Sequence, residues 1–303
     1  MQFVVEYPLG LDDEGQPWSK PSSMAAFAAA LEAAGVDAVA LTDHPAPSRK
    51  WLDHGGHATI DPFVGLGFWA GITTRLRLMT LLTVVPYRNP LLMTKSMTAV
   101  DIVSGGRATF VLGTGYLRSE FLALGVEFEE RNALFDEAVD VAKAWWSTGE
   151  LHYEGKHFTA VGQALFPRQV QQPHPPLWLG GNAAAVRERV ARWGDGWAPL
   201  LGGGTVPRTA RTVTIATDDD FVSALADLGE RLERHGRSLA DIDVVGSLDA
   251  TRRGLADPDA FLEGVGRLTE MGVTWTHAPV VRGTIAESLD AVARFGEEIR
   301  AKV

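Results

Sequence analysis

The sequence predicts an α/β protein of the (β/α)8 TIM-barrel class, with insertions at the C-terminal face of the barrel. Eight short β-branched or apolar segments alternate strictly with eight amphipathic segments along the 303 residues. Strict alternation indicates parallel strands joined by right-handed crossovers, and eight such units are the number that closes a barrel. An open doubly wound sheet is the alternative. Because no linker rich in Pro, Gly and Ser divides the chain, we expect a single domain over residues 1–303.

The predicted strands are short apolar runs bounded by turn residues. They cover residues 2–7, 37–42, 76–85, 107–112, 176–181, 196–200, 242–248 and 273–281. The first of them lacks a cationic stretch ahead of a long apolar run, so we interpret it as a strand and not as a signal peptide.

The predicted helices show apolar residues at helical spacing. They cover residues 22–34, 62–73, 90–104, 130–147, 183–193, 219–235, 258–271 and 284–300. Two of them have strong start signals, because Asp61 and Asn89 each place a capping side chain before a proline at the first helical position. We expect irregular insertions at residues 46–60, 152–175 and 201–216.

Charge and cysteine content restrict the function. The formal net charge is −10 and the chain has no cysteine. An acidic chain offers no basic field for nucleic acid or for an anionic membrane. Without cysteine there are no disulfides, thiolate metal sites or thiol nucleophiles, and no apolar run reaches membrane-span length. We therefore expect a cytoplasmic protein with a small-molecule substrate and no nucleic-acid or membrane partner.

Five sequence blocks occur in an order that resembles the luciferase-like monooxygenase superfamily. They are PYRNP (86–90), DIVSGGR (101–107), GTGYLRSEF (113–121), PPLWLGGN (175–182) and WGDGW (193–197). Within that superfamily the chain is most similar to the predicted oxidoreductases that use coenzyme F-420. The resemblance implies a bacterial-luciferase-like barrel, a homodimer or higher homo-oligomer, and F-420 (8-hydroxy-5-deazaflavin) as cofactor, with FMN as the alternative. It also implies that a separate flavin or F-420 reductase supplies the reduced cofactor.

Asp43 and His44 are the candidate catalytic residues. They come directly after the second predicted strand, at the barrel mouth where catalytic groups collect. An imidazole that titrates near neutrality can move the proton that accompanies hydride transfer, and the neighbouring carboxylate could orient it or favour its charged form. The alternative is a polar pair that only caps a turn. The resemblance places both residues against the deazaflavin.

Further cofactor-binding residues are expected at two other strands. In the third strand, Leu81, Leu82 and Thr83 are core residues by their pattern, and the resemblance places a β-bulge with a non-proline cis peptide at Leu81–Leu82 behind the cofactor ring. At the end of the fourth, the absence of side chains at Gly113 and Gly115, on either side of Thr114, would let a ring or phosphate approach the backbone. A simple strand-to-helix turn is the alternative there.

The turn Gly180-Gly181-Asn182 precedes a helix, so free N–H groups at that helix start would bind an anion. The resemblance places the flavin phosphate near this turn, and the alternative is a Gly-Gly turn with an Asn cap. Trp51, Tyr116 and Trp197 are expected to form the substrate wall. Where the superfamily's sugar-phosphate dehydrogenases have a glutamate acid, this chain has Tyr116, which argues against sugar-phosphate oxidation and leaves the proton donor open.

No metal is expected. His54 and His57 are three residues apart, but no neighbouring residue completes a ligand set. The signatures of nucleotide hydrolysis, zinc proteolysis and serine-hydrolase chemistry are also absent from the sequence. The leading hypothesis is therefore an oxidoreductase that transfers a hydride between F-420 and a small organic substrate. The alternatives are an FMN-dependent two-component monooxygenase and a non-catalytic flavin-binding protein.

Overall fold

Parallel strands form the main sheet of the computed structural model, which describes residues 1–9, 18–202 and 212–303. Its strands are β1 (Gln2–Glu6), β2 (Ala38–Leu41), β3 (Arg77–Val84), β4 (Ala108–Gly113), β7 (Leu177–Gly180), β8 (Gly196–Ala198), β9 (Asp243–Val244) and β10 (Trp275–His277). The sheet order is β10-β1-β2-β3-β4-β7-β8-β9, and the strand pairs β10–β1–β2, β3–β4 and β7–β8–β9 are parallel. All eight predicted strands are confirmed, and the fold class is the (β/α)8 barrel.

Helices alternate with these strands along the chain. The eight predicted helices are confirmed as α1 (Pro21–Ala33), α3 (Pro62–Ala70), α4 (Pro90–Val103), α6 (Arg131–Thr148), α7 (Ala184–Trp193), α9 (Asp218–Arg234), α11 (Pro258–Glu270) and α12 (Ile285–Glu298). Both predicted start signals act as expected, because the Asp61 carboxylate accepts the Phe63 and Val64 N–H groups and the Asn89 side chain accepts the Leu91 N–H.

Shorter helical segments were not expected from the sequence. The short α-helices are α2 (Arg49–Leu52), α5 (Arg118–Ala123) and α10 (Asp249–Arg252). The 3-10 turns are η1 (Val85–Tyr87), η2 (Phe128–Glu130), η3 (Leu239–Asp241), η4 (Gly254–Ala256) and η5 (Arg300–Lys302). The predicted insertion at 46–60 thus contains α2, while much of the one predicted at 201–216 lies outside the described residues.

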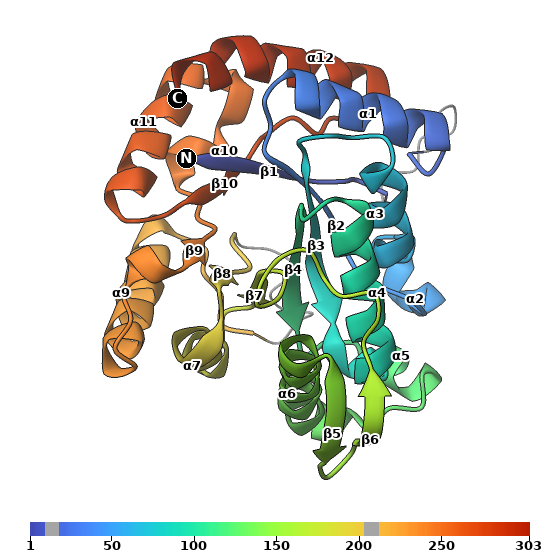
Figure 1. Cartoon of the computed structure of the whole chain (residues 1–303). Helices are drawn as coiled ribbons and strands as arrows, with labels where there is room; N and C mark the ends of the chain where they lie inside the picture. Colours follow the sequence, from blue (N-terminus) through green and yellow to red (C-terminus); the bar gives the residue numbers. More distant parts are fainter. Residues whose placement is uncertain (10–17, 203–211) are drawn as a thin grey trace. The chain divides into compact units, whose positions relative to one another are not determined.

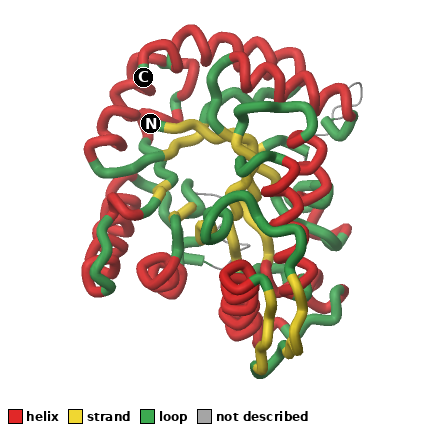
Figure 2. Tube along the Cα trace, in the orientation of Figure 1, coloured by secondary structure: helices red, strands yellow, loops and turns green. Residues whose placement is uncertain are grey.

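The prediction that residues 152–175 are irregular is wrong for their first part. An antiparallel hairpin of β5 (Glu150–Glu154) and β6 (Thr159–Ala164) forms there, and Figure 2 shows it beside the helix α6. The indole N–H of Trp145 on α6 donates to the Gln163 carbonyl at 2.7 Å. Most side chains of the hairpin are exposed or half-exposed, so the sequence lacks the apolar run that marks a buried strand.

The described residues group into two compact units. The first comprises residues 1–40, 75–77 and 177–303. Within it α1 and α12 lie side by side (Figure 1), and the Phe3 ring of β1 meets the Phe295 ring of α12 edge-on with centroids 5.0 Å apart. A parallel bridge between Val245 and Trp275 adds a contact between the segments of β9 and β10.

The second unit comprises residues 41–74 and 78–176. Two residues of the DIVSGGR block hold its loops. The Asp101 carboxylate accepts the N–H groups of Val170 and Gln171 at 2.7 and 3.0 Å. The Arg107 guanidinium donates to the Thr73 carbonyl at 2.9 Å, which fixes the end of α3. The grouping of contacts does not test the single-domain prediction, which stays a prediction.

The described residues, 1–9, 18–202 and 212–303, include neither a membrane-spanning helix nor a metal cluster. No helix in these ranges is long and apolar enough to cross a membrane. No group of three or more His, Cys, Asp or Glu side chains in the same ranges is placed to hold a metal ion.

Candidate active site

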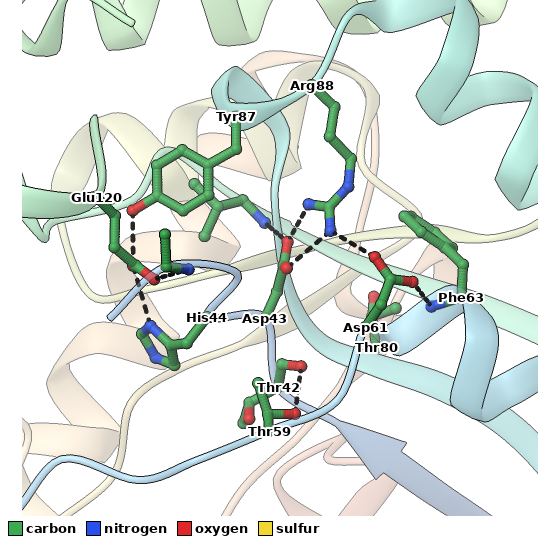
Figure 3. A network of polar contacts seen from close by, with 12 residues as sticks. Thr42, Asp43, His44, Thr59, Asp61, Phe63, Thr80, Tyr87, Arg88 and Glu120 are labelled. Atoms are coloured by element: carbon green, nitrogen blue, oxygen red, sulfur yellow. Dashed lines mark hydrogen bonds and ion pairs between the residues drawn. The ribbon is translucent and has the colours of Figure 1, made fainter. Parts of the chain in front are cut away.

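Asp43, at the end of β2, is an anchor for the backbone that follows β3. Its carboxylate is buried and accepts the Val84 N–H at 2.9 Å. The Arg88 guanidinium donates to both carboxylate oxygens, with Nη2 2.9 Å from Oδ1. Arg88 also pairs with Asp61 at 3.2 Å (Figure 3). Asp43 therefore holds the η1 turn in place. The positive Arg88 guanidinium balances the negative charge of the Asp43 carboxylate.

His44 is oriented by Glu120, which corrects the expectation that Asp43 does this. Nδ1 of His44 lies 3.1 Å from Oε2 of Glu120, and both side chains are almost fully buried. Glu120 belongs to α5, 76 positions later in the chain. Figure 3 shows Glu120 turned toward His44 while Asp43 turns toward Arg88. A carboxylate that accepts the Nδ1 proton leaves Nε2 as the nitrogen that can take up another.

Glu120 is itself fixed by two further donors. The Ala46 N–H donates to Oε1 at 3.1 Å, and the Tyr87 hydroxyl donates to Oε2 at 3.0 Å. A buried carboxylate is stable only when it is hydrogen-bonded and paired. The three partners come from the β2 loop and from η1, so the site is assembled from segments far apart in sequence.

Aromatic rings surround the His44 imidazole. Its centroid lies 4.5 Å from Trp51, 4.9 Å from His57 and 6.1 Å from Tyr116. Trp51 lies on α2, whose first turn is capped by the Ser48 side chain. A Cβ at Gly56 would lie 2.4 Å from the Trp51 ring, so only glycine lets the chain pass there. The structure thus places the predicted substrate-wall residues Trp51 and Tyr116 beside His44.

Burial changes the ionisation of these rings. Burial, and then the charge of His44, lower the pKa of His57 to about 4, while Glu120 opposes the shift. Burial, and then Glu120, raise the pKa of Tyr116 to about 12. The pKa of Tyr87 is also raised, first by burial and then by Glu120. At neutral pH His57 is therefore uncharged, and both phenols keep their protons as possible donors.

The backbone features predicted for the third strand, a cis peptide and a β-bulge at Leu81–Leu82, are confirmed. The Leu81–Leu82 peptide is cis, and the pairing of β3 with β4 shifts register between Leu81 and Thr83. Leu81 and Leu82 are half-exposed in a strand that is otherwise largely buried. The Thr83 hydroxyl is buried without a hydrogen-bond partner among the residues described.

Protein side chains pack directly against Gly113 and Gly115, and cofactor binding at these glycines stays a prediction. A Cβ at Gly113 would lie 2.5 Å from the Leu82 side chain, and one at Gly115, where φ is +75°, would lie 2.6 Å from Val84. Protein side chains therefore occupy the space that these glycines open. Thr114, between them, is half-exposed. Close packing of the second unit explains both glycines.

In the first unit, Asn182 is a structural residue and not the cap of α7. Its amide donates to the Leu200 and Val213 carbonyls at 2.8 and 2.7 Å and accepts the Leu200 N–H at 2.7 Å. The cap of α7 is Ala183, which makes no side-chain capping bond. Gly180 ends β7 and is buried, whereas Gly181 has φ +120° and its N–H donates to Ala198. Whether this turn binds a phosphate stays a prediction.

Trp197 does not form a substrate wall in this structure, which corrects that prediction. Its side chain is fully buried and stacks on Phe221 of α9 with an interplanar angle of 9°. Its indole N–H donates to the Gly181 carbonyl at 3.0 Å. Both the indole N–H and the ring of Trp197 are therefore in contact with other protein groups.

The sequence reasoning missed Glu120, Tyr87, Arg88 and His57 as members of the site. The first three lie inside the PYRNP and GTGYLRSEF blocks, which were used only to recognise the resemblance. The signal that could have identified Glu120 was an acidic residue shortly after the fourth strand, where α5 buries it. His57 was placed with Trp51 in the segment that could line the substrate, but neither a metal nor a catalytic role was assigned to it.

Comparison with known proteins now fixes the family. The family model described as luciferase-like monooxygenase matches residues 1–251. The chain belongs to this family. It is 28% identical over 246 residues to an uncharacterized protein of Mycobacterium tuberculosis, covering 81% of this chain and 77% of that one. It is 30% identical over 227 residues to the F420-dependent glucose-6-phosphate dehydrogenase of Kineococcus radiotolerans, covering 74% and 62%.

Solved structures agree on the fold. The monooxygenase RslO1 from Streptomyces bottropensis superimposes with a TM-score of 0.77 at 21% identity, covering 100% of this chain and 99% of that one. The coenzyme F420-dependent tetrahydromethanopterin reductase from Methanopyrus kandleri gives 0.72 at 18% identity, covering 99% of each. Enzymes with different named chemistries thus share this barrel, so the fold alone does not select the reaction.

Proposed function

We propose that this protein transfers a hydride between coenzyme F-420 and a small organic substrate, and that His44 moves the accompanying proton. The observation that carries the proposal is the buried His44–Glu120 pair with its 3.1 Å contact. A carboxylate-oriented imidazole is the usual form of a proton-transfer catalyst. The 30% identity to a protein named as an F420-dependent dehydrogenase supports the choice of cofactor.

Two features of β3 support the choice of a flat deazaflavin ring as the cofactor. The half-exposed pair Leu81–Leu82 offers an apolar surface, and the Thr83 hydroxyl, which has no partner among the described residues, offers a hydrogen-bonding group. A buried hydroxyl without a partner is costly and points to a group that completes it. When bound, F-420 supplies the site that accepts or gives a hydride.

The protein's own contribution is proton transfer and exclusion of water. Glu120 accepts the Nδ1 proton of His44, so Nε2 is the atom that takes the proton from a substrate hydroxyl or returns it to a carbonyl oxygen. Trp51 packs against the His44 ring and shields it from solvent. Tyr116, whose raised pKa keeps its phenol protonated, is a second possible donor.

Rapid-mixing kinetics with the full-length protein tests this proposal. Reduced F-420 is mixed with a panel of ketones, aldehydes and activated alkenes, and its reoxidation is followed by absorbance under anaerobic conditions. We expect substrate-dependent reoxidation that is lost in His44→Ala. Oxygen insertion into a substrate with reduced FMN, and no reaction with F-420, would instead establish the two-component monooxygenase.

A further inference from the structure

His57 is a second imidazole in the candidate site that the mechanism above does not use. It lies between α2 and α3, with its ring edge-on to His44 at a centroid distance of 4.9 Å and an interplanar angle of 82°. On another side it packs against Trp51 at 5.4 Å. Its Nε2 is buried and has no hydrogen-bond partner in the part of the chain that the structure describes.

An unpartnered buried nitrogen lowers stability, so its presence calls for an explanation. His54, three residues earlier, shows the contrast, because its Nδ1 lies 2.7 Å from the Lys50 carbonyl on an exposed surface. His57 lies against the proposed catalytic imidazole, where a ligand would supply the missing partner.

The charged groups of the candidate site favour an uncharged ligand at His57. Burial keeps the pKa of His57 near 4, so it is neutral at physiological pH. Glu120 is a buried acid that pairs with His44. Arg88, the guanidinium held by Asp43, is also shared with Asp61 (Figure 3). A phosphate or carboxylate next to His44 would thus approach Glu120, while Arg88 is already paired with two carboxylates.

We propose that His57 determines substrate specificity by hydrogen-bonding through Nε2 to the oxygen of an uncharged alcohol or its ketone, whose apolar body packs against Trp51. This inference rests on the proposed function for its reaction. In the oxidative direction the carbinol C–H and O–H bonds break and the C=O bond forms. The hydride leaves the carbon for oxidised F-420, and the proton leaves the oxygen for His44 Nε2. His57 holds that oxygen and is unchanged.

Binding can be measured without turnover. We would titrate 15N-histidine-labelled full-length protein with cyclohexanol, cyclohexanone and cyclohexyl phosphate, and follow the imidazole resonances of His44 and His57. The variants are His57→Phe, which keeps the ring and loses the nitrogen, and His57→Gln, which restores a polar group. His54→Phe is the matched control because His54 is an exposed histidine in the same segment.

We expect both neutral probes to shift the two resonances, with cyclohexyl phosphate binding more weakly than cyclohexanol. Loss of one neutral hydrogen bond should weaken cyclohexanol binding about 2- to 12-fold in His57→Phe. His57→Gln should recover part of the loss, and His54→Phe should bind as wild type does. Ligand-free His57→Phe should melt no lower than wild type, since it removes an unpartnered polar atom. A histidine with a purely structural role would give a lower melting temperature.

Three results would overturn the inference. They are equal cyclohexanol affinity in His57→Phe and His54→Phe, tighter binding of cyclohexyl phosphate than of cyclohexanol, and no binding of either neutral probe. A parallel titration with F-420 separates this inference from the proposed function. If F-420 binds but the neutral probes do not depend on His57, the specificity assignment fails alone. If the probes depend on His57 but F-420 does not bind, the proposed function fails and the binding site remains.

Discussion

The segment after β2 and the turn after β7 each follow a buried strand but differ in how their polar side chains are used. Each was expected to contact the cofactor. After β2, His57 keeps a buried nitrogen without a partner in the described residues, beside His44. After β7, Asn182 satisfies three backbone groups with its amide. In these two segments the unpartnered nitrogen lies beside the proposed catalytic histidine, whereas the partnered amide holds the backbone of a turn.

The sharpest way to test this contrast is His44→Ala. A general acid-base group contributes about 10²- to 10⁴-fold to rate, so kcat should fall by that factor. F-420 affinity should change far less, because ring contacts are shared among many residues. Steady-state kinetics and a coenzyme titration on the same preparation measure both. A folded variant with unchanged kcat would remove His44 from the reaction and make Tyr116 the next candidate.

Asn182→Ala should act on stability and leave the reaction intact. Three backbone groups, two of Leu200 and one of Val213, would lose their partner. At about 1 kcal/mol for each, the free energy of unfolding should fall by about 3 kcal/mol. Urea denaturation measures it, and kcat of the folded variant is the control. A loss of F-420 affinity without a loss of stability would mean that Asn182 binds the coenzyme after all.

Glu120→Gln should lower kcat about 10- to 100-fold, by analogy with carboxylates that orient metal-bound histidines. A positioning role has a specific signature, since the His44→Ala/Glu120→Gln double variant should be no slower than His44→Ala alone. Glu129→Gln, which changes an exposed glutamate paired with Arg118, is the matched control. Multiplicative losses in the double variant would show that Glu120 acts independently of His44.

His57 should make stability depend on pH. Its pKa is lowered from 6.5 to about 4 in the folded protein, so the unfolded chain takes up the proton first as pH falls. The stability of the neutral form is fully present above about pH 6.5 and is lost as pH falls toward 4. At pH 5 the loss should be about 2 kcal/mol. Denaturation at pH 7 and pH 5 should show this loss in wild type but not in His57→Phe, and equal losses would refute the burial of a neutral imidazole.

The smallest expected effect is that of Trp197→Phe. Phenylalanine keeps the stacking on Phe221 and loses the indole hydrogen bond to Gly181. The free energy of unfolding should fall by about 1 kcal/mol, with KM and kcat unchanged. A clear rise in KM would return Trp197 to the substrate wall.

The sequence predicts the barrel well because its signals are local. Apolar runs mark the strands, and Asp61 and Asn89 mark helix starts that the structure confirms. The hairpin of β5 and β6 was missed because its strands are mostly solvent-accessible and carry no such run. The local pattern therefore identifies strands that are buried along their length and fails for strands that are mostly exposed.

The site was only half predictable for a different reason. His44 and the cis peptide at Leu81–Leu82 were found through position and resemblance. Their partners were not, since Glu120 lies 76 positions from His44 and Arg88 lies 45 positions from Asp43. Adjacency in sequence suggested that Asp43 orients His44, whereas tertiary packing gives that role to Glu120. Which carboxylate meets which cation depends on the fold and has no local signature.

Parallel equilibrium titration of the purified protein with F-420 and FMN tests the central claim most directly. Intrinsic tryptophan fluorescence reports the binding of both, and His44→Ala controls for a folded protein with an altered site. The account predicts saturable micromolar binding of F-420 that clearly exceeds the affinity for FMN. Tighter binding of FMN, or no binding of F-420, would contradict it.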